Sequence, residues 1–293
     1  MILEDRIFAF EKLGKYLINF DKLEFEKEII QSAEDNNPWF TESSIRFSLL
    51  AVAKILLSNN LCSWIKSYSI VNQQKRVGVI IPSNIPLVGF YDFLCILLSG
   101  NIFIGQLSLS NSILLPYLAN LLFNFNSDFK KYIFFKRLVS NRDIDMLIAT
   151  GNDSSAYYFN YFYLHLPKII RKNRKSIAVL NGFETVKDYE KLSFDIYTYF
   201  GLGCRNVSHL FIPSGFDIDK LRHPFRKHQI CLSSRNYTAN YSYQKSILQI
   251  NNVDFIDFGN LLLVESDKIN APISVLHYQY YNSIKDVEKY LNA

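Results

Sequence analysis

Cys204 is the residue of this chain best suited to act as a nucleophile. It follows two glycines and precedes Arg205 in the stretch GLGCRN, residues 201–206. Glycines allow close backbone approach, and the Arg205 charge would stabilise a thiolate if it points inward. Any single cysteine is more often a buried structural residue, and we interpret Cys62 and Cys95 in that way. The stretch is not a dinucleotide fingerprint, because it follows a predicted helix and precedes a predicted strand.

A side-chain amide, Asn84, lies between Pro82 and Pro86, directly after an apolar segment over 77–81 that is typical of a buried strand. Ligands bind at such strand ends in open α/β sheets. An asparagine there could donate its N–H to an oxyanion that develops on a carbonyl. The alternative is a rigid turn in which Asn84 satisfies its own backbone, and spacing alone favours the turn.

A second predicted strand end carries small polar residues. The segment 146–149 leads into Thr150, Gly151 and Asn152, followed by a polar helix start. A helix N-terminus of this kind can hold a phosphate or position a cofactor ring. The same order of strand, glycine and helix builds ordinary βα turns, so the pattern alone leaves both interpretations open.

The composition argues against several other classes of protein. Since 32 basic residues are nearly matched by 27 acidic ones, the net charge of +5 does not indicate a nucleic-acid partner. The four cysteines have no CxxC spacing and no metal-type pairing with the five histidines, so we expect neither a metal site nor an oxidised scaffold. The N-terminus lacks a secretory signal, and we expect a cytoplasmic protein.

The remaining pattern predicts the elements that position these residues. Apolar spacing indicates helices over residues 1 to about 70, and strands and helices alternate after that. Such alternation predicts an α/β fold with parallel strands, and we place a domain boundary near 175. The segment 77–105 has Asp92 as its only charge, but its prolines would break a helix in lipid, so we expect no membrane insertion. The expected strands are 77–81, 102–104, 146–149, 177–180 and 210–212, and the expected later helices are 87–99, 114–123 and 189–200.

The order of these motifs is more specific than any one of them. The PxNxP loop, Ser99-Gly100-Asn101, Thr150-Gly151, Cys204 and Asn270-Ala271-Pro272-Ile273 together resemble the aldehyde dehydrogenase superfamily. Longer stretches are similar to acyl-CoA reductases related to the long-chain fatty acyl reductase of bacterial luminescence systems. These stretches are VGVIIPSNIPLVGFYDFLCILLSGN, IATGNDSSAYYF, IIRKNRKSIAVL, YFGLGCRNVSHLFIP and APISVLHYQYY, and the resemblance spans residues 5 to 290.

The resemblance implies an aldehyde dehydrogenase-like α/β fold in three parts. Residues 1–70 would form a helical region packed on a Rossmann-type NADP(H)-binding domain over 71–175. Residues 176–293 would form an α/β catalytic domain. Relatives continue beyond Ala293 into a further strand and a loop over the catalytic pocket, so we expect this domain to lack its C-terminal end.

The implied activity is the NADPH-linked reduction of a fatty acyl thioester, carried by coenzyme A or a protein, to the aldehyde. Cys204 would accept the acyl group, and Asn84 with the backbone N–H of Cys204 would form the oxyanion hole. The general-base glutamate of hydrolytic aldehyde dehydrogenases would fall near Arg171, where this chain has no carboxylate. Without a base to activate water, the acyl-enzyme would survive for hydride attack.

By the same match, Thr150 and Gly151 would lie near the nicotinamide. The stretch 100–110 would approach the adenosine end of the cofactor. Gln106 stands where relatives commonly have lysine, and no acidic residue accompanies it, which would favour the 2′-phosphate of NADPH. The cofactor contacts implied at the adenosine end are Gly100, Gln106 and Ser108.

Two other functions stay open. A decayed enzyme would also lack the carboxylate at Arg171, so the alternative is a catalytically weakened relative that binds acyl chains or docks on an acyl-transfer partner. A cysteine-dependent thioesterase is disfavoured, because no histidine or carboxylate is recognisably placed to activate water. A homo-oligomer is compatible with all of these functions.

Overall fold

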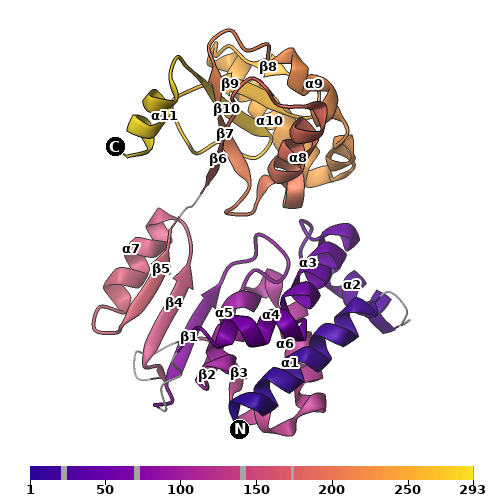
Figure 1. Ribbon diagram of the computed structural model, residues 1–293, viewed down its shortest axis with the longest axis vertical. Helices are drawn as coiled ribbons and strands as arrows, with labels where there is room; N and C mark the ends of the chain where they lie inside the picture. The colour runs from indigo at the N-terminus through magenta and orange to yellow at the C-terminus, as the bar shows by residue number, and fades with distance from the viewer. Residues whose placement is uncertain (21–24, 69–72, 139–142, 173–174, 293) are drawn as a thin grey trace. The chain divides into compact units, whose positions relative to one another are not determined.

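The computed structural model describes residues 1–20, 25–68, 73–138, 143–172 and 175–292 (Figure 1). The chain divides into two compact units, Met1–Asn173 and Arg174–Ala293. Each unit contains its own five-stranded sheet.

The sheet of the first unit has the strand order β3-β2-β1-β4-β5, and all its pairings are parallel. This is the order of a Rossmann fold, in which ligands bind at the carboxyl ends of the strands where the strand order reverses, here between β1 and β4. The predicted parallel α/β fold is confirmed for this unit. The strands are β1 (Arg76–Ile81), β2 (Ile102–Leu107), β3 (Ile133–Phe135), β4 (Met146–Thr150) and β5 (Lys168–Arg171).

The helices of the first unit that precede β3 share one apolar core with this sheet. Phe10 of the first helix packs edge-on against Phe93, with 6.2 Å between ring centroids, and Phe93 packs against Phe103 of β2 at 5.0 Å. The predicted helical N-terminal region is confirmed, and the Thr41 side chain caps the helix Glu42–Ile55 by accepting the N–H of Ser44. The helices are α1 (Leu3–Ile18), α2 (Phe25–Asn36), α3 (Glu42–Ile55), α4 (Ser58–Ile65), α5 (Phe90–Leu98), α6 (Leu114–Phe125) and α7 (Asp153–Phe162), with short 3₁₀ turns at Leu109–Asn111 and Ser127–Lys131.

A buried cation satisfies the end of α5. Arg6 of α1 is 7% exposed, and its Nη1 donates to the carbonyl oxygens of Leu97 at 3.1 Å and Leu98 at 2.9 Å. The last carbonyls of a helix have no partner within the helix, and a positive charge there is favourable. Gly100 follows with a φ of +83°, and a Cβ at this position would lie 2.7 Å from Arg6 Nη1. Packing therefore requires glycine here.

The second unit has the strand order β6-β7-β10-β9-β8, parallel except for β8. The strands are β6 (Ser176–Val179), β7 (Val207–Pro213), β8 (Ile256–Asp257), β9 (Leu262–Glu265) and β10 (Val275–Tyr281). The helices are α8 (Val186–Tyr197), α9 (Asp219–Arg226), α10 (Arg235–Ile250) and α11 (Ile284–Leu291), with 3₁₀ turns at Thr198–Gly201 and Gln229–Ser233.

Two helices differ from their predicted limits for the same physical reason. The helix expected from Leu87 begins at Phe90, because Leu87 has a φ of 55°. The helix expected to run to Phe200 ends at Tyr197, because Tyr199 and Phe200 have φ values of 53° and 59°. Positive φ is incompatible with a right-handed helix, and hydrophobic spacing does not report it.

We predict that Arg6→Met destabilises the first unit. The substitution keeps the apolar stem but removes the donors to the last carbonyls of α5, which should lower the free energy of unfolding by about 2 kcal/mol. Urea unfolding followed by circular dichroism measures this change. The control Lys15→Met, at an exposed position of the same helix, should stay within about 0.5 kcal/mol of wild type. Equal stability of both variants would show that Arg6 contributes nothing there.

Candidate active site

The loop that carries Asn84 is held by three buried side chains from three different segments. Each donor is 4% exposed, and each donates to a carbonyl of the loop. Bonds of this kind make the loop rigid, because a buried carbonyl left without a donor is costly. These bonds therefore hold the turn that the two prolines predict, and they fix the backbone that carries Asn84. The bonds are Asn37 Nδ2 to Ser83 O at 2.8 Å, Ser48 Oγ to Pro86 O at 3.1 Å and Asn111 Nδ2 to Pro82 O at 2.8 Å.

The sheet brings Thr150 and Gly151 to the same edge as this loop. Ile80 of β1 pairs with Ala149 of β4, so the strands end side by side. Asn152 caps α7, and its side chain accepts the N–H of Ser155 at 2.8 Å. The loop of Asn84 and the Thr150-Gly151 turn thus flank the reversal point between β1 and β4, where Rossmann folds bind ligands.

The three residues implied at the adenosine end do not lie together. Gln106 and Ser108 are at the carboxyl end of β2, on the edge just described, since Gln106 pairs with Ile80. Gly100 precedes β2 and lies at the opposite end of that strand, beside Arg6. The Gln106 Oε1 accepts the N–H of Leu138 at 2.7 Å, so this side chain ties down the segment that follows β3.

An ion pair that the sequence analysis missed lies at the same edge. Arg171 ends β5 and pairs with Thr150 in the sheet. Its Nη1 and Nη2 contact the two Asp92 oxygens at 2.6 and 2.8 Å, and Asp92 is 8% exposed. A bidentate pair of this geometry is strong and directional. The available signal was Asp92 itself, because a lone carboxylate in an apolar helix needs a cationic partner.

In the second unit, Cys204 lies in a tight turn directly before β7, and it is exposed. The turn is organised by Asn206, which is 7% exposed. Its Oδ1 accepts the N–H of Gly203 at 2.7 Å, and its Nδ2 donates to carbonyls at the end of α8. The three residues over 199–201 that lead into this turn all have positive φ. Strained backbone of this kind concentrates at functional sites.

The other thiols have environments that suit structural roles. Burial raises the pKa of Cys95 and that of Cys231 to about 11, so both are held as neutral thiols at pH 7. Cys62 is half-buried in α4. Of the four cysteines, Cys204 is the one that is exposed. This exposure suits a nucleophile, because a reacting thiol has to be accessible to its substrate.

Within the described residues, no three side chains among His, Cys, Asp and Glu gather in a way that could hold a metal ion. No helix in the described ranges is both long and apolar enough to cross a membrane.

Comparison with known proteins identifies the fold. No family model matches the chain, and no curated protein matches it. Among solved structures, an NAD-dependent aldehyde dehydrogenase from Sinorhizobium meliloti matches with a TM-score of 0.74 at 12% identity, covering 100% of this chain and 68% of that one. Aldehyde dehydrogenase 21 from Physcomitrella patens, in complex with succinate, matches with a TM-score of 0.73 at 11% identity, covering 100% and 71%.

A third structure is a variant of Aldehyde Dehydrogenase C from Pseudomonas syringae in complex with NAD⁺ and octanal. It matches with a TM-score of 0.70 at 11% identity, covering 100% of this chain and 70% of that one. The chain therefore has the aldehyde dehydrogenase fold, as the sequence predicted.

We predict that Asn111→Ala loosens the Asn84 loop and destabilises the first unit. Removing the donor to Pro82 O leaves a buried carbonyl without a partner, which should cost about 1–3 kcal/mol. Chemical denaturation of the full chain gives this value. Asn120→Ala, at an exposed position on α6, is the matched control and should be neutral. A neutral Asn111→Ala would show that the loop does not depend on this bond.

Proposed function

We propose that this protein is an NADPH-dependent acyl-CoA reductase that converts a fatty acyl thioester, long-chain by its resemblance, into the aldehyde through an acyl-enzyme on Cys204. The observation that carries the proposal is the Arg171–Asp92 ion pair. By the resemblance, the general base of hydrolytic aldehyde dehydrogenases would fall near Arg171, and here the Arg171 guanidinium is paired with the Asp92 carboxylate. An acyl-enzyme without a base to activate water is long-lived enough for reduction.

In the proposed reaction, the Cys204 thiolate attacks the thioester carbonyl. The Asn84 amide and the Cys204 backbone N–H stabilise the resulting oxyanion, and the coenzyme A thiolate leaves. NADPH, when bound, supplies a hydride to the carbonyl carbon of the acyl-enzyme. The C–S bond then breaks, the aldehyde is released and Cys204 returns as a thiolate. An acyl group carried by a protein thiol would react in the same way.

The end of β2 supports the choice of NADPH over NADH in this proposal. Rossmann folds that bind NAD commonly place a carboxylate near the end of the second strand to bind the ribose 2′-hydroxyl. Here Gln106 and Ser108 occupy the end of β2, and the described segment 106–113 contains no carboxylate. We assign the adenosine end to these two residues and the nicotinamide end to Thr150 and Gly151, and we leave Gly100 out because it lies at the other end of β2.

One contact favours a second candidate, an acyl-binding relative that does not turn over. Gln106 Oε1 accepts the Leu138 N–H, which fixes the orientation of this amide, and an uncharged amide attracts a phosphate less strongly than the lysine of relatives would. Such a protein would accept an acyl group on Cys204 and keep it.

We predict that Cys204→Ala abolishes acyl-enzyme formation. The full chain is mixed with palmitoyl-CoA, with and without NADPH, and Cys204 peptides are examined by mass spectrometry. A hydroxylamine-labile adduct that disappears with NADPH and yields aldehyde supports the reductase, whereas a persistent adduct supports the second candidate. Cys62→Ala should react like wild type. Turnover in Cys204→Ala would refute the assignment of the nucleophile.

We also predict that Asn84→Ala slows acylation by about 100- to 1,000-fold, as is usual when one oxyanion donor is removed. Coenzyme A release in single-turnover experiments reports this step. Binding of NADPH, followed by fluorescence, should be unchanged because the amide is assigned to the substrate oxyanion. An unchanged acylation rate would remove Asn84 from the proposed site.

A further inference from the structure

The segment that follows β3 carries a cation beside the end of β2. The Lys136 N–H donates to the carbonyl of Gly105 at 3.0 Å, and the Leu138 N–H donates to Gln106 Oε1 at 2.7 Å. Arg137 lies between these two anchored residues, at the edge of the sheet where β1, β2 and β4 also end. Its backbone is therefore fixed against β2, the strand whose end is assigned to the adenosine of the cofactor.

Leu138 makes this arrangement rigid. Its side chain is 5% exposed and belongs to a buried cluster of sheet and α7 residues that includes Ile104. Its carbonyl accepts the hydroxyl of Tyr163 at 3.3 Å. A residue that is held through its N–H, its carbonyl and its side chain cannot move without losing buried contacts. The backbone of Arg137, one residue earlier, is held with it.

Arg137 has the chemistry of a phosphate-binding residue. It is exposed, and among the residues that the structure describes no carboxylate forms an ion pair with it. The neighbouring Lys136, in contrast, is paired with Asp143, at 3.6 Å between Nζ and Oδ1. A guanidinium is planar and carries five N–H donors, so it can bind two phosphate oxygens at once. The arginine is therefore available to an anion at this edge.

The end of β2 adds neutral groups that suit a nucleoside. The hydroxyl oxygens of Ser108 and Ser110 lie 3.4 Å apart, and Leu109 between them is 91% exposed. Hydroxyls can donate to phosphate or ribose oxygens. The described segment 106–113 contains no carboxylate that would repel a phosphate. These groups therefore complement a cation at Arg137 and do not oppose it.

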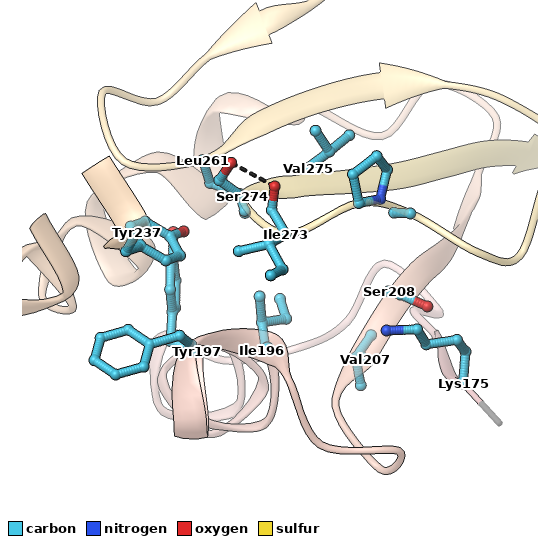
Figure 2. Close-up of a pocket in the computed structure, with 14 residues that line it drawn as sticks. Lys175, Ile196, Tyr197, Val207, Ser208, Tyr237, Leu261, Ile273, Ser274 and Val275 are labelled. Carbon is cyan, nitrogen blue, oxygen red and sulfur yellow. Dashed lines mark hydrogen bonds between the residues drawn. The ribbon is translucent and has the colours of Figure 1, made fainter. Parts of the chain in front are cut away.

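Lys175, in the second unit, also has no ion pair among the described residues, but its surroundings differ. It lines a small pocket together with Ser208 and Ile273 (Figure 2). The cavity volume there is about 20 Å³, which is room for about one water molecule. A phosphate does not fit into such a space. Arg137, which is exposed, has no such restriction.

We propose that Arg137 binds the 2′-phosphate of NADPH, and that Gln106 is a positioning residue that holds Arg137 in place through the Leu138 N–H. By the resemblance, relatives commonly have a lysine where this chain has Gln106. Here the cation lies on the segment after β3, and Gln106 contributes position instead of charge. The identity of the ligand as NADPH rests on the proposed function, whereas the anchored arginine without an ion pair does not.

Binding is measured by calorimetry on the full chain, with NADPH, NADH, adenosine 2′,5′-bisphosphate and adenosine 5′-monophosphate as ligands. The wild-type protein should bind NADPH at least about tenfold more tightly than NADH, because the 2′-phosphate adds charge-assisted bonds. The bisphosphate should exceed the monophosphate by a similar factor. Equal affinities within each pair would overturn the proposal.

Arg137→Met removes the charge and keeps an apolar stem. It should raise the Kd for NADPH about 10- to 100-fold, the usual effect of losing bonds to a charged group, and leave the Kd for NADH within about twofold. Arg137→Lys should recover part of the affinity, since lysine keeps the charge but not the planar fork. Lys130→Met, at an exposed position before β3, removes the same charge at the other end of that strand and should behave like wild type. An unchanged Kd for NADPH in Arg137→Met would refute the assignment.

A double-mutant cycle separates positioning from direct contact. Gln106→Met removes the acceptor of the Leu138 N–H, and it should raise the Kd for NADPH about fivefold with little effect on NADH. In the Arg137→Met background the same change should have no further effect, because Gln106 acts through Arg137. Independent effects of the two substitutions would show that Gln106 contacts the phosphate itself. Loss of NADH binding in Gln106→Met would show a purely structural role, and either result would overturn the positioning role.

Acyl transfer separates this inference from the proposed function. Selectivity for the 2′-phosphate that depends on Arg137, without any palmitoyl adduct on Cys204, would refute the proposed function alone. Aldehyde formation from the adduct, with the same Kd for NADPH in wild type and Arg137→Met, would refute this inference alone. A wild-type protein that binds neither NADPH nor the bisphosphate would refute both.

Discussion

Parallel strands covered on both faces leave room for polar side chains mainly at the strand ends, and this constraint decides where chemistry can occur in both units. In the first unit, the Asn84 loop, the Thr150 turn and Arg171 follow β1, β4 and β5. In the second unit, Lys175 and the Cys204 turn precede β6 and β7. Each unit thus presents one sheet edge that carries its candidate functional side chains.

The need to satisfy buried polar groups makes these edges rigid. Three side-chain donors bind the carbonyls of the Asn84 loop. The Asn206 side chain fixes the turn before β7, because it accepts the N–H of Gly203 and donates to the carbonyl of Asp195. Leaving any of these groups without a partner costs free energy, so the native arrangement is strongly preferred over alternatives. The same bonds that stabilise the fold therefore position an amide and a thiol.

Charge is handled differently at the two edges. In the first unit, Asp92 and Arg171 form a bidentate ion pair, in which the two terminal guanidinium nitrogens each donate to one carboxylate oxygen. In the second unit, Lys175 lies in a pocket without an acidic partner among the described residues. A compensated cation supports structure, whereas a partly buried cation without an ion pair, beside a thiol, is a candidate for a functional role.

The sequence by itself determined the class of fold, because alternation of apolar strands with amphipathic helices has few solutions other than a parallel sheet. It also located Asn84, Thr150 and Cys204 at element ends, since glycine, proline and polar residues interrupt apolar runs there. Only the tertiary structure decided the limits of α5 and α8 and the pairing of Asp92 with Arg171. Backbone strain and ion pairs depend on contacts between residues distant in the chain, which local spacing does not encode.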